Sequence, residues 1–424
     1  MEKNIEEKKV EKVKKYIFLT ASISNIGGAE LYMRQKLLYV KSIGFDPLVI
    51  YVKKTGPVYI NEFIDVSCAV PEIAYPPKFY FNSKRKNILS KILTVIGDVN
   101  EETIIESHLV HLAMWGELVA SNFNGKNFIY LLSETYPSYT NSIYDFLKFK
   151  LKRRELVGIN DHTLQLLFKK NLLLNNEQCY NLHAWMGDSI ENIQSSLVNI
   201  VDSSADMKIG CYGRLEKRYV QHAISVIKSY CLLNPKTKIQ LVLIGGSFDN
   251  ELLDKYQKMS SQISNLALYI TGFIYPVPLD FLKKLDFLIA GSGAACAAVR
   301  HSLLTISMDI YGMPIGVLGI TTENTMERDY NDHDSNELLD YIERFRKKIY
   351  NPGDINGIEP YPNLTIEFRK HMDFMERGNS SKVYFDTINA GSFYKSMLYK
   401  FFGKRYYVKI ERTIKKIKEY GYFK

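Results

Sequence analysis

The stretch "KYIFLTASISNIGGAELYMRQKLLYVKSIGFDPLVIYV", residues 15–52, decides how the chain begins to fold. An apolar run of strand character ends in a loop that carries two adjacent glycines. Apolar side chains then recur at helical spacing as far as Gly44, and residues 46–52 have the composition of a second buried strand. A strand, a helix and a strand in this order predict a parallel pair joined by a right-handed crossover.

Strands continue to alternate with helices through the first half of the chain, and the alternation restarts at Met207 after a polar connector. This pattern predicts an α/β protein with two Rossmann-like domains, because each strand-helix pair extends a mostly parallel sheet. The predicted boundaries are an N-terminal domain at 1–190, a linker at 191–206, a C-terminal domain at 207–385 and a basic aromatic helical tail at 386–424.

Composition indicates a folded protein and excludes several classes. The 424 residues are 46% hydrophobic and 24% charged, and they suffice for two domains. No stretch approaches the ~18 apolar residues of a membrane span, and the charged first residues lack the apolar segment of a secretion signal. Five scattered cysteines without a CxxC pair predict neither disulfides nor a thiolate zinc site. We therefore expect a cytoplasmic protein that binds no metal.

The C-terminal stretch 393–424 mixes many lysines and arginines with Phe and Tyr. Such a mixture suits an anionic membrane surface, so one interpretation is peripheral contact with the inner face of the cell membrane. The alternative is a terminal helix that packs its aromatic face on the protein. Nothing in the chain resembles a module that binds DNA or RNA, so no nucleic-acid partner is expected.

Open α/β sheets bind ligands outside the carboxyl ends of their strands, so two such domains facing one another predict a cleft for a two-substrate reaction. The motifs "GGAE" (27–30), "GCYGRLEKR" (210–218) and the succession "LVLIGG…LYITGFI…DFLIAGSG" (241–293) resemble GT-B glycosyltransferases of family four. The resemblance covers roughly residues 14–330. It implies a metal-independent hexosyltransferase that takes a UDP- or GDP-sugar as donor, with no further cofactor, and holds it mainly in the C-terminal domain.

The resemblance places the glycine-rich turn after the first strand at the cleft, and it carries over to Gly27, Gly28 and, less directly, Glu30. Glycine leaves room for a ligand, and the N–H groups at a helix start attract anionic oxygens. The alternative is a tight strand-to-helix connection in which Glu30 interacts with the positive end of the helix dipole.

A second site falls on the turn after the strand that begins at Met207. Family members carry an arginine and, a few residues later, a lysine that together neutralise the donor diphosphate. Arg214 matches, while the lysine is displaced, so Lys217 or Arg218 must substitute. Cations held there would stabilise the charge that develops on a departing nucleoside diphosphate. The alternative is surface charges, although cations oppose the dipole at a helix start.

Related enzymes have a small-residue turn and then a donor-binding glutamate where this chain has Ala297. The amides of Ser292 and Gly293 remain candidates for phosphate. Further candidates for the donor follow a later apolar strand, with Glu323 as the substitute carboxylate: Thr322, Glu323 and Asn324. The alternative is that Thr322 caps a helix.

On the acceptor side, His108 follows a strand, and Glu134 follows the next strand after Ser133. An imidazole or a carboxylate there would assist the acceptor hydroxyl, so both are predicted as catalytic together with Arg214. The alternative for His108 is a satisfied structural side chain. The "DHD" triplet at 332–334 is better explained by a helix that Asp334 or Ser335 caps than by a metal.

Two functions remain open from the sequence. The first is a transferase that acts on a glycan or lipid-linked saccharide in bacterial surface polysaccharide or glycoconjugate synthesis. The second is a catalytically inactive partner subunit of a glycosyltransferase complex, in which Ala297 and the displaced lysine mark the loss of activity. A homo-oligomer is left open in both.

Overall fold

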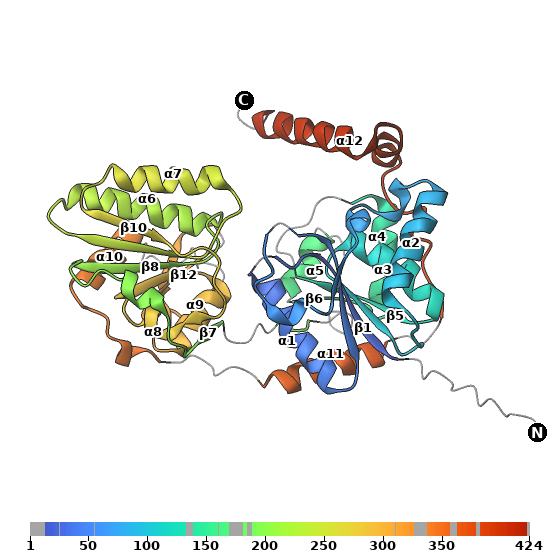
Figure 1. The fold of residues 1–424 in the computed structure, drawn as a ribbon, viewed down its shortest axis with the longest axis horizontal. Coiled ribbons are helices and arrows are strands. Elements are labelled where there is room, and N and C mark those ends of the chain that lie inside the picture. The colour runs from blue at the N-terminus through green and yellow to red at the C-terminus, as the bar shows by residue number, and fades with distance from the viewer. Residues whose placement is uncertain are drawn as a thin grey trace, which may run out of the picture. The chain divides into compact units, whose positions relative to one another are not determined.

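The computed structural model describes residues 13–24, 26–54, 56–132, 139–159, 161–168, 181–184, 189–309, 311–325, 337–356, 363–378 and 382–421. Two compact units divide the chain (Figure 1). The first unit comprises Met1–Ile23, Tyr32–Trp185 and Asn363–Lys424, and the second comprises Ser24–Leu31 and Met186–Pro362.

The first unit is built on a six-stranded parallel sheet in the order β3-β2-β1-β4-β5-β6. Its strands are β1 (Lys15–Ser22), β2 (Asp46–Lys53), β3 (Ser67–Ala69), β4 (Ile104–Ser107), β5 (Lys126–Leu131) and β6 (Leu156–Gly158). The predicted parallel pair is confirmed, with Phe18 of β1 opposite Val49 of β2.

Helices cover both faces of this sheet, since alternate side chains of each strand point to opposite sides. On one face Ile17 and Ile105 pack with Ile92 and Trp115 of α2 and α3. The helices of the unit are α1 (Gly28–Ser42), α2 (Asn82–Ile96), α3 (Val110–Phe123), α4 (Asn141–Lys152), α5 (Asp161–Leu167), α11 (Leu364–Glu376) and α12 (Phe393–Gly421), with 3-10 turns η1 (Asn61–Phe63), η2 (Pro71–Ala74) and η3 (Pro77–Phe79).

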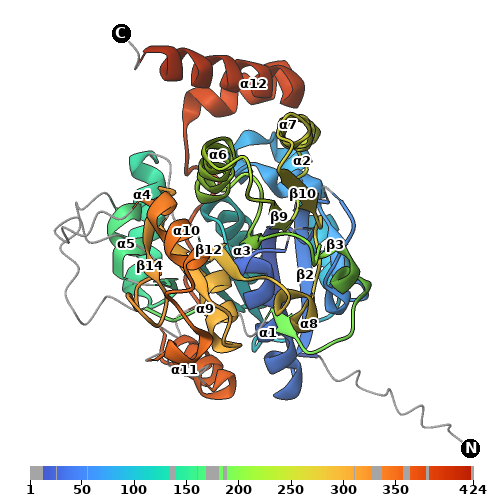
Figure 2. The same ribbon diagram turned by 90° about the vertical axis from the view of Figure 1, so that its left-hand side faces the viewer.

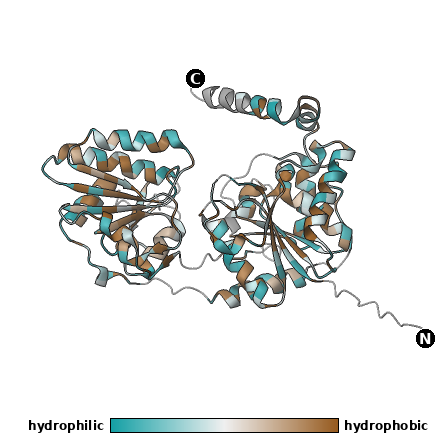
Figure 3. Cartoon of the chain, viewed as in Figure 1, coloured by the Kyte–Doolittle hydropathy of each residue, from teal (hydrophilic) through white to brown (hydrophobic). Residues whose placement is uncertain are grey.

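The second unit repeats the design with a six-stranded sheet in the order β10-β9-β8-β12-β13-β14. Only β14 runs antiparallel, because the short turn after Met308 cannot make the crossover that a parallel neighbour needs. The strands are β8 (Met207–Tyr212), β9 (Ile239–Ile244), β10 (Leu266–Ile270), β12 (Phe287–Ala290), β13 (Thr305–Met308) and β14 (Pro314–Val317). The helices are α6 (Arg218–Leu233), α7 (Asn250–Ser261), α8 (Leu279–Leu282), α9 (Ser292–Arg300) and α10 (Leu338–Arg346), with the 3-10 turn η5 (Pro352–Asp354). Figure 3 shows the apolar strands inside each unit and the polar faces of the covering helices outside.

The predicted linker 191–206 is more ordered than expected. Its start pairs with the rest of the unit through β7 (Ile190–Glu191) and β11 (Val277–Pro278). The 3-10 turn η4 (Ser196–Ile200) packs Leu197 and Val198 on the apolar cluster around Phe281. Residues 190–206 therefore belong to the second unit.

The chain returns to the first unit earlier than the predicted boundary at 385. Helix α11 lies on the face of the first sheet opposite α2 and α3, where Phe368 and His371 contact the ring of Tyr32 and His371 also contacts Tyr130. The prediction missed this because Tyr32 and Tyr130, which α11 contacts, are more than 200 residues away in sequence. Residues 363–385 therefore complete the first unit.

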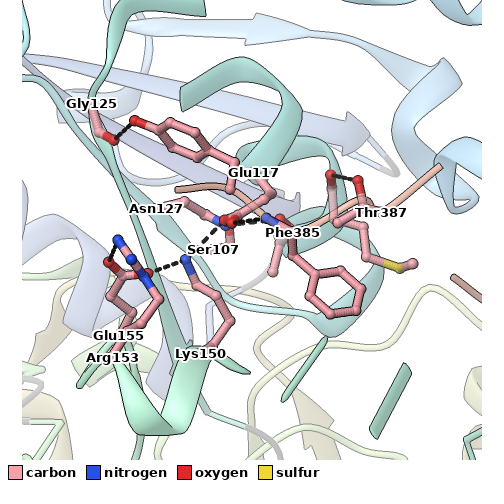
Figure 4. Close-up of polar contacts among 12 residues, drawn as sticks. Ser107, Glu117, Gly125, Asn127, Lys150, Arg153, Glu155, Phe385 and Thr387 are labelled. Carbon is pink, nitrogen blue, oxygen red and sulfur yellow. Dashed lines mark hydrogen bonds and ion pairs between the residues drawn. The ribbon is translucent and has the colours of Figure 1, made fainter. Parts of the chain in front are cut away.

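The segment after α11 is fixed to the first unit by a buried ionic network (Figure 4). Glu117 of α3 accepts hydrogen bonds from Lys150 Nζ (2.8 Å), Asn127 Nδ2 (2.9 Å) and the backbone N–H of Phe385 (3.0 Å). Lys150 also pairs with Glu155, which Arg153 contacts at 2.9 Å. Two carboxylates and two cations thus balance in a site with almost no exposure to water.

Helix α12 has two pieces, because Gly403 adopts non-helical angles (φ +72°, ψ 171°). Figure 2 shows the bend between them. Among the helices within the described residues, none is long and apolar enough to cross a bilayer.

Candidate functional site

The loops after β8 and β9, at the carboxyl edge of the second sheet, pack unusually closely. A Cβ on Gly213 would lie 1.9 Å from the hydroxyl of Tyr219, and a Cβ on Gly245 would lie 2.2 Å from the carbonyl oxygen of Gly213. Both glycines also have positive φ, +157° and +145°, respectively. A side chain at Gly213 would displace Tyr219, and one at Gly245 would displace the loop that contains Gly213.

Tyr219 contacts both the end of β8 and the turn before α9 at this edge. Its hydroxyl donates to the carbonyl of Tyr212 at 2.8 Å, and its ring lies 3.3 Å from where a Cβ of Gly291 would stand. Burial, more than its neighbours, raises the pKa of Tyr219, so the phenol stays neutral. The loop that precedes α6 and the turn that precedes α9 are therefore neighbours, which brings Arg214 and Ser292 to the same edge.

Three cations gather where α6 begins. Arg214 and Arg218 are exposed and Lys217 is half-buried, with Lys217 at the N-cap position. Glu216, the acidic residue of the loop, accepts a hydrogen bond from Ser247 Oγ at 2.5 Å, and the first turn of α6 has no acidic residue. Cations beside the positive end of a helix are unfavourable unless an anion binds there. The edge is thus suited to an anionic ligand.

The start of α9 is more enclosed than the sequence indicated. Ser292 has φ +51°, which is uncommon for a residue with a side chain. Its backbone N–H, predicted to contact phosphate, instead donates to the carbonyl of Thr325 at 3.3 Å. Ser307 Oγ donates to the carbonyl of Asn324 at 3.0 Å. Residues 324 and 325 therefore lie against the first turn of α9, where Gly293 follows Ser292.

The polar cluster predicted to bind the donor lies on this loop. Thr322 Oγ1 accepts from the N–H of Asn324 at 3.0 Å, which is a local turn of the Ser/Thr type. Glu323 and Asn324 are exposed. The structure therefore brings Thr322, Glu323 and Asn324 close to Ser292. The helix cap that the alternative placed at Thr322 does not form, because residues 323–325, its expected first turn, are not helical.

Ala297 offers no polar group at the position of the family's glutamate. It is 2% exposed and belongs to an apolar cluster with Leu288 and Leu303. No carboxylate of α9 replaces the missing one, since the helix sequence Ser292–Arg300 contains none.

Asp309, which follows β13, was not among the predicted site residues. Its Oδ1 accepts from the N–H groups of Tyr311 (2.9 Å) and Met313 (2.7 Å), and its Oδ2 has no hydrogen-bond partner within the described residues. Gly312, with φ +100°, lies against the backbone of Arg218. The Asp309 turn therefore supports the start of α6. An aspartate that follows a strand, three residues before a glycine, was the available signal.

Gly27 and Gly28 lie at the start of α1, with the carbonyl of Gly27 accepting from the N–H of Leu31 at 3.0 Å. Glu30 is in the first turn, and its carboxylate lies 3.0 Å from where a Cβ of Gly27 would stand. A carboxylate in this position agrees with the interpretation based on the helix dipole.

His108 is almost fully buried, with 5% of its surface exposed. Its Nε2 lies 3.0 Å from Oε1 of Glu106, which also accepts from the hydroxyls of Tyr16 and Tyr32. Burial alone would raise the pKa of Glu106, but the hydrogen bond from His108, the charges of His108 and Lys36 and the Tyr16 hydroxyl together lower it. These contacts favour the structural interpretation of His108.

The remaining predicted residues are outside the described part of the chain: Ser133, Glu134 and the triplet at 332–334. Helix α10 begins at Leu338 with Glu337 at its N-cap, whereas the cap was predicted at Asp334 or Ser335. Within the residues that the structure describes, no group of three or more His, Cys, Asp or Glu side chains is arranged to hold a metal ion.

Several solved structures share this fold. A glycosyltransferase from Rickettsia africae ESF-5 matches with a TM-score of 0.56 and 13% identity, over 86% of this chain and 98% of its own. Anabaena Alr3699/HepE, solved with UDP and glucose, matches with a TM-score of 0.55 and 12% identity, over 86% of this chain and 96% of its own. The catalytic domain of starch synthase IV from Arabidopsis thaliana, bound to ADP and acarbose, matches with a TM-score of 0.51 and 11% identity. The match covers 86% of this chain and 99% of that domain.

No family model matches the sequence, and no curated protein matches it. At identities this low, the structural likeness establishes the fold. The chain has the GT-B fold of two Rossmann-like domains, as the order of its motifs predicted.

Proposed function

We propose that the protein transfers a sugar from a UDP- or GDP-linked donor to a glycan or lipid-linked saccharide, in the synthesis of a bacterial surface polysaccharide or glycoconjugate. The observation that carries the proposal is the cluster of Arg214, Lys217 and Arg218 at the start of α6. A nucleoside diphosphate would be an anion that suits this cluster. Structures of the same fold, solved with UDP and glucose or with ADP and acarbose, give the proposal its substrate class.

In this proposal the cations act on the leaving group. When the bond between the sugar and the diphosphate breaks, negative charge grows on the diphosphate oxygens. Arg214 would stabilise that charge directly, and Lys217 or Arg218 would share it with the N–H groups of the first turn of α6. Fixed cations of this kind do the work that a metal ion does elsewhere, so donor turnover should persist in EDTA.

Calorimetric titration with UDP, GDP and their hexose conjugates tests the donor site. We expect Arg214→Ala to weaken nucleotide binding at least tenfold, because a charge-assisted contact with phosphate contributes about 1.5–3 kcal/mol. Arg346→Ala is the matched control: Arg346 belongs to the same unit but pairs with Glu343 on α10. If both variants bind nucleotide as tightly as the unaltered protein, the diphosphate site is elsewhere or does not exist.

The inactive partner subunit is the second candidate, and the apolar surroundings of Ala297 favour it. The two candidates differ in turnover. A transferase should release free UDP or GDP from its donor, slowly with water and faster with an acceptor. Tight nucleotide binding without any release, over a panel of hexose donors with acceptor extracts, would favour the inactive subunit.

A further inference from the structure

Two adjacent phenylalanines are exposed at the bend of α12. The side chains of Phe401 and Phe402 are 68% and 57% exposed, and the positive φ of Gly403 ends the first helical piece directly after them. Lys400 precedes the pair, and Lys404 and Arg405 follow the bend. Adjacent large aromatic side chains that are more than half exposed to water are unfavourable, and such surfaces mark sites of interaction.

More exposed rings lie on the same helix and at the start of α2. Phe81, directly before α2, is 55% exposed, and Lys400 Nζ lies 5.6 Å from the centre of its ring. We call this surface the aromatic face: Phe81, Phe393, Tyr394, Phe401, Phe402 and Tyr406, each more than half exposed.

The opposite side of α12 fixes the aromatic face to the first unit. Tyr407 is 3% exposed and packs edge-on against Tyr75 and Phe79. Lys78 Nζ donates to the carbonyls of Asn389 (2.7 Å) and Gly391 (3.0 Å) just before the helix. The packing alternative considered for the tail therefore accounts for Tyr407 but leaves the aromatic face in water.

The surroundings of the aromatic face are strongly basic. By sequence, residues 393–421 contain nine lysines and arginines and two glutamates, a net charge of +7 in a chain whose total is +9. Among those whose side chains the structure describes, five are basic and only Glu411 is acidic. Helix α2 adds four basic residues and no acidic one. The carboxylate of Glu411 pairs with Lys395 at 3.4 Å, which leaves most of the positive charge uncompensated by α12 itself.

We propose that the aromatic face binds the anionic surface of a lipid bilayer, so that the first unit attaches peripherally to a membrane. The rings of Phe401 and Phe402 would enter the boundary between headgroups and acyl chains, and the surrounding cations would contact the headgroups. Charge argues against a second copy as the occupant. A two-fold contact would place two helices of net charge +7 against each other.

The inference does not depend on the proposed transferase activity, because none of its residues lies in the second unit. It adds to that activity, since a membrane surface is where a lipid-linked acceptor would be found. Vesicle binding and nucleotide binding are separate measurements, so the failure of one proposal leaves the other standing.

Co-sedimentation of the full-length protein with vesicles tests the inference. We expect binding to vesicles of equimolar phosphatidylglycerol and phosphatidylcholine, little binding to phosphatidylcholine alone, and weaker binding as salt rises. Phe401→Ser with Phe402→Ser should weaken binding at least tenfold. Lys400→Glu with Lys404→Glu should remove the preference for anionic vesicles.

The matched control is Leu232→Ser with Leu233→Ser, a pair of adjacent apolar residues at the end of α6 that are 62% and 70% exposed. This variant should bind vesicles like the unaltered protein. The inference is overturned if the phenylalanine variant still binds normally while folded, if the control loses binding equally, or if neutral vesicles bind as well. It is also overturned if light scattering shows a dimer that the phenylalanine variant dissociates, because the aromatic face would then join two copies.

Discussion

Lys36 is a single buried residue that lowers the stability of the folded protein. It is fully buried on α1, 5.0 Å from the centre of the Phe368 ring, and its Nζ makes no hydrogen bond within the described residues. Burial lowers the pKa of Lys36 to about 7, while the charge of Glu106 acts in the opposite direction. An uncharged side chain of similar length at this position would avoid the cost of burying the ammonium group.

We predict that Lys36→Met stabilises the protein and flattens its pH dependence. The unfolded chain holds a proton on Lys36 up to about pH 10.5, whereas the folded protein loses it near pH 7. The free energy of unfolding therefore rises with pH between these values in the unaltered protein. Lys36→Met should gain about 2–4 kcal/mol at pH 7 and clearly less at pH 9.

Urea unfolding at pH 7 and pH 9, followed by tryptophan fluorescence, measures this, since both tryptophans belong to the first unit. Lys91→Met, which alters an exposed lysine paired with Glu72, is the control and should change neither value much. An equal gain for Lys36→Met at both pH values would contradict the assigned titration.

Among the elements, the loops after β8 and β9 are the most constrained. We predict that Gly245→Ala abolishes nucleotide binding, because the added methyl group would lie 2.2 Å from the carbonyl of Gly213 and displace the loop that carries Arg214. Calorimetry with UDP and GDP measures the loss. Gly353→Ala is the control, since a Cβ there meets nothing within 4 Å. Normal binding by a folded Gly245→Ala variant would contradict the assignment of this edge.

Elements with a strong local pattern were predictable, and those without one were not. The apolar runs of β1, β9 and β12 determine their strands from a few neighbouring residues. Helix α2 was missed although its second half is apolar: Ile88, Ile92 and Ile96 are buried, and Leu89, Leu93 and Val95 pack against the same cluster. Its first six residues, 82–87, are polar and show no helical pattern. Contacts between segments that are distant in sequence could not be predicted from neighbouring residues either. The backbone N–H of Ser292 donates to the carbonyl of Thr325, and this hydrogen bond depends on how a loop 33 residues later in the sequence folds back.

At the scale of the whole molecule, the buried network around Glu117 fixes the segment after α11 to the first unit. We predict that Lys150→Met destabilises the protein by about 3–5 kcal/mol, because it leaves Glu117 and Glu155 buried without their shared cation. Lys370→Met, which removes an exposed partner of Glu367, should cost less than about 1 kcal/mol. Urea unfolding compares the two, and similar losses would mean that the network contributes little.

The interrupted path of the first unit has a consequence for biosynthesis. A ribosome that has released residues 1–185 has supplied the whole of the first sheet but not α11, so the side of that sheet around Tyr32 and Tyr130 has no cover. About 180 further residues must be translated before the cover arrives. During that delay the nascent chain exposes apolar surface, so we expect chaperones that bind apolar segments to associate with it.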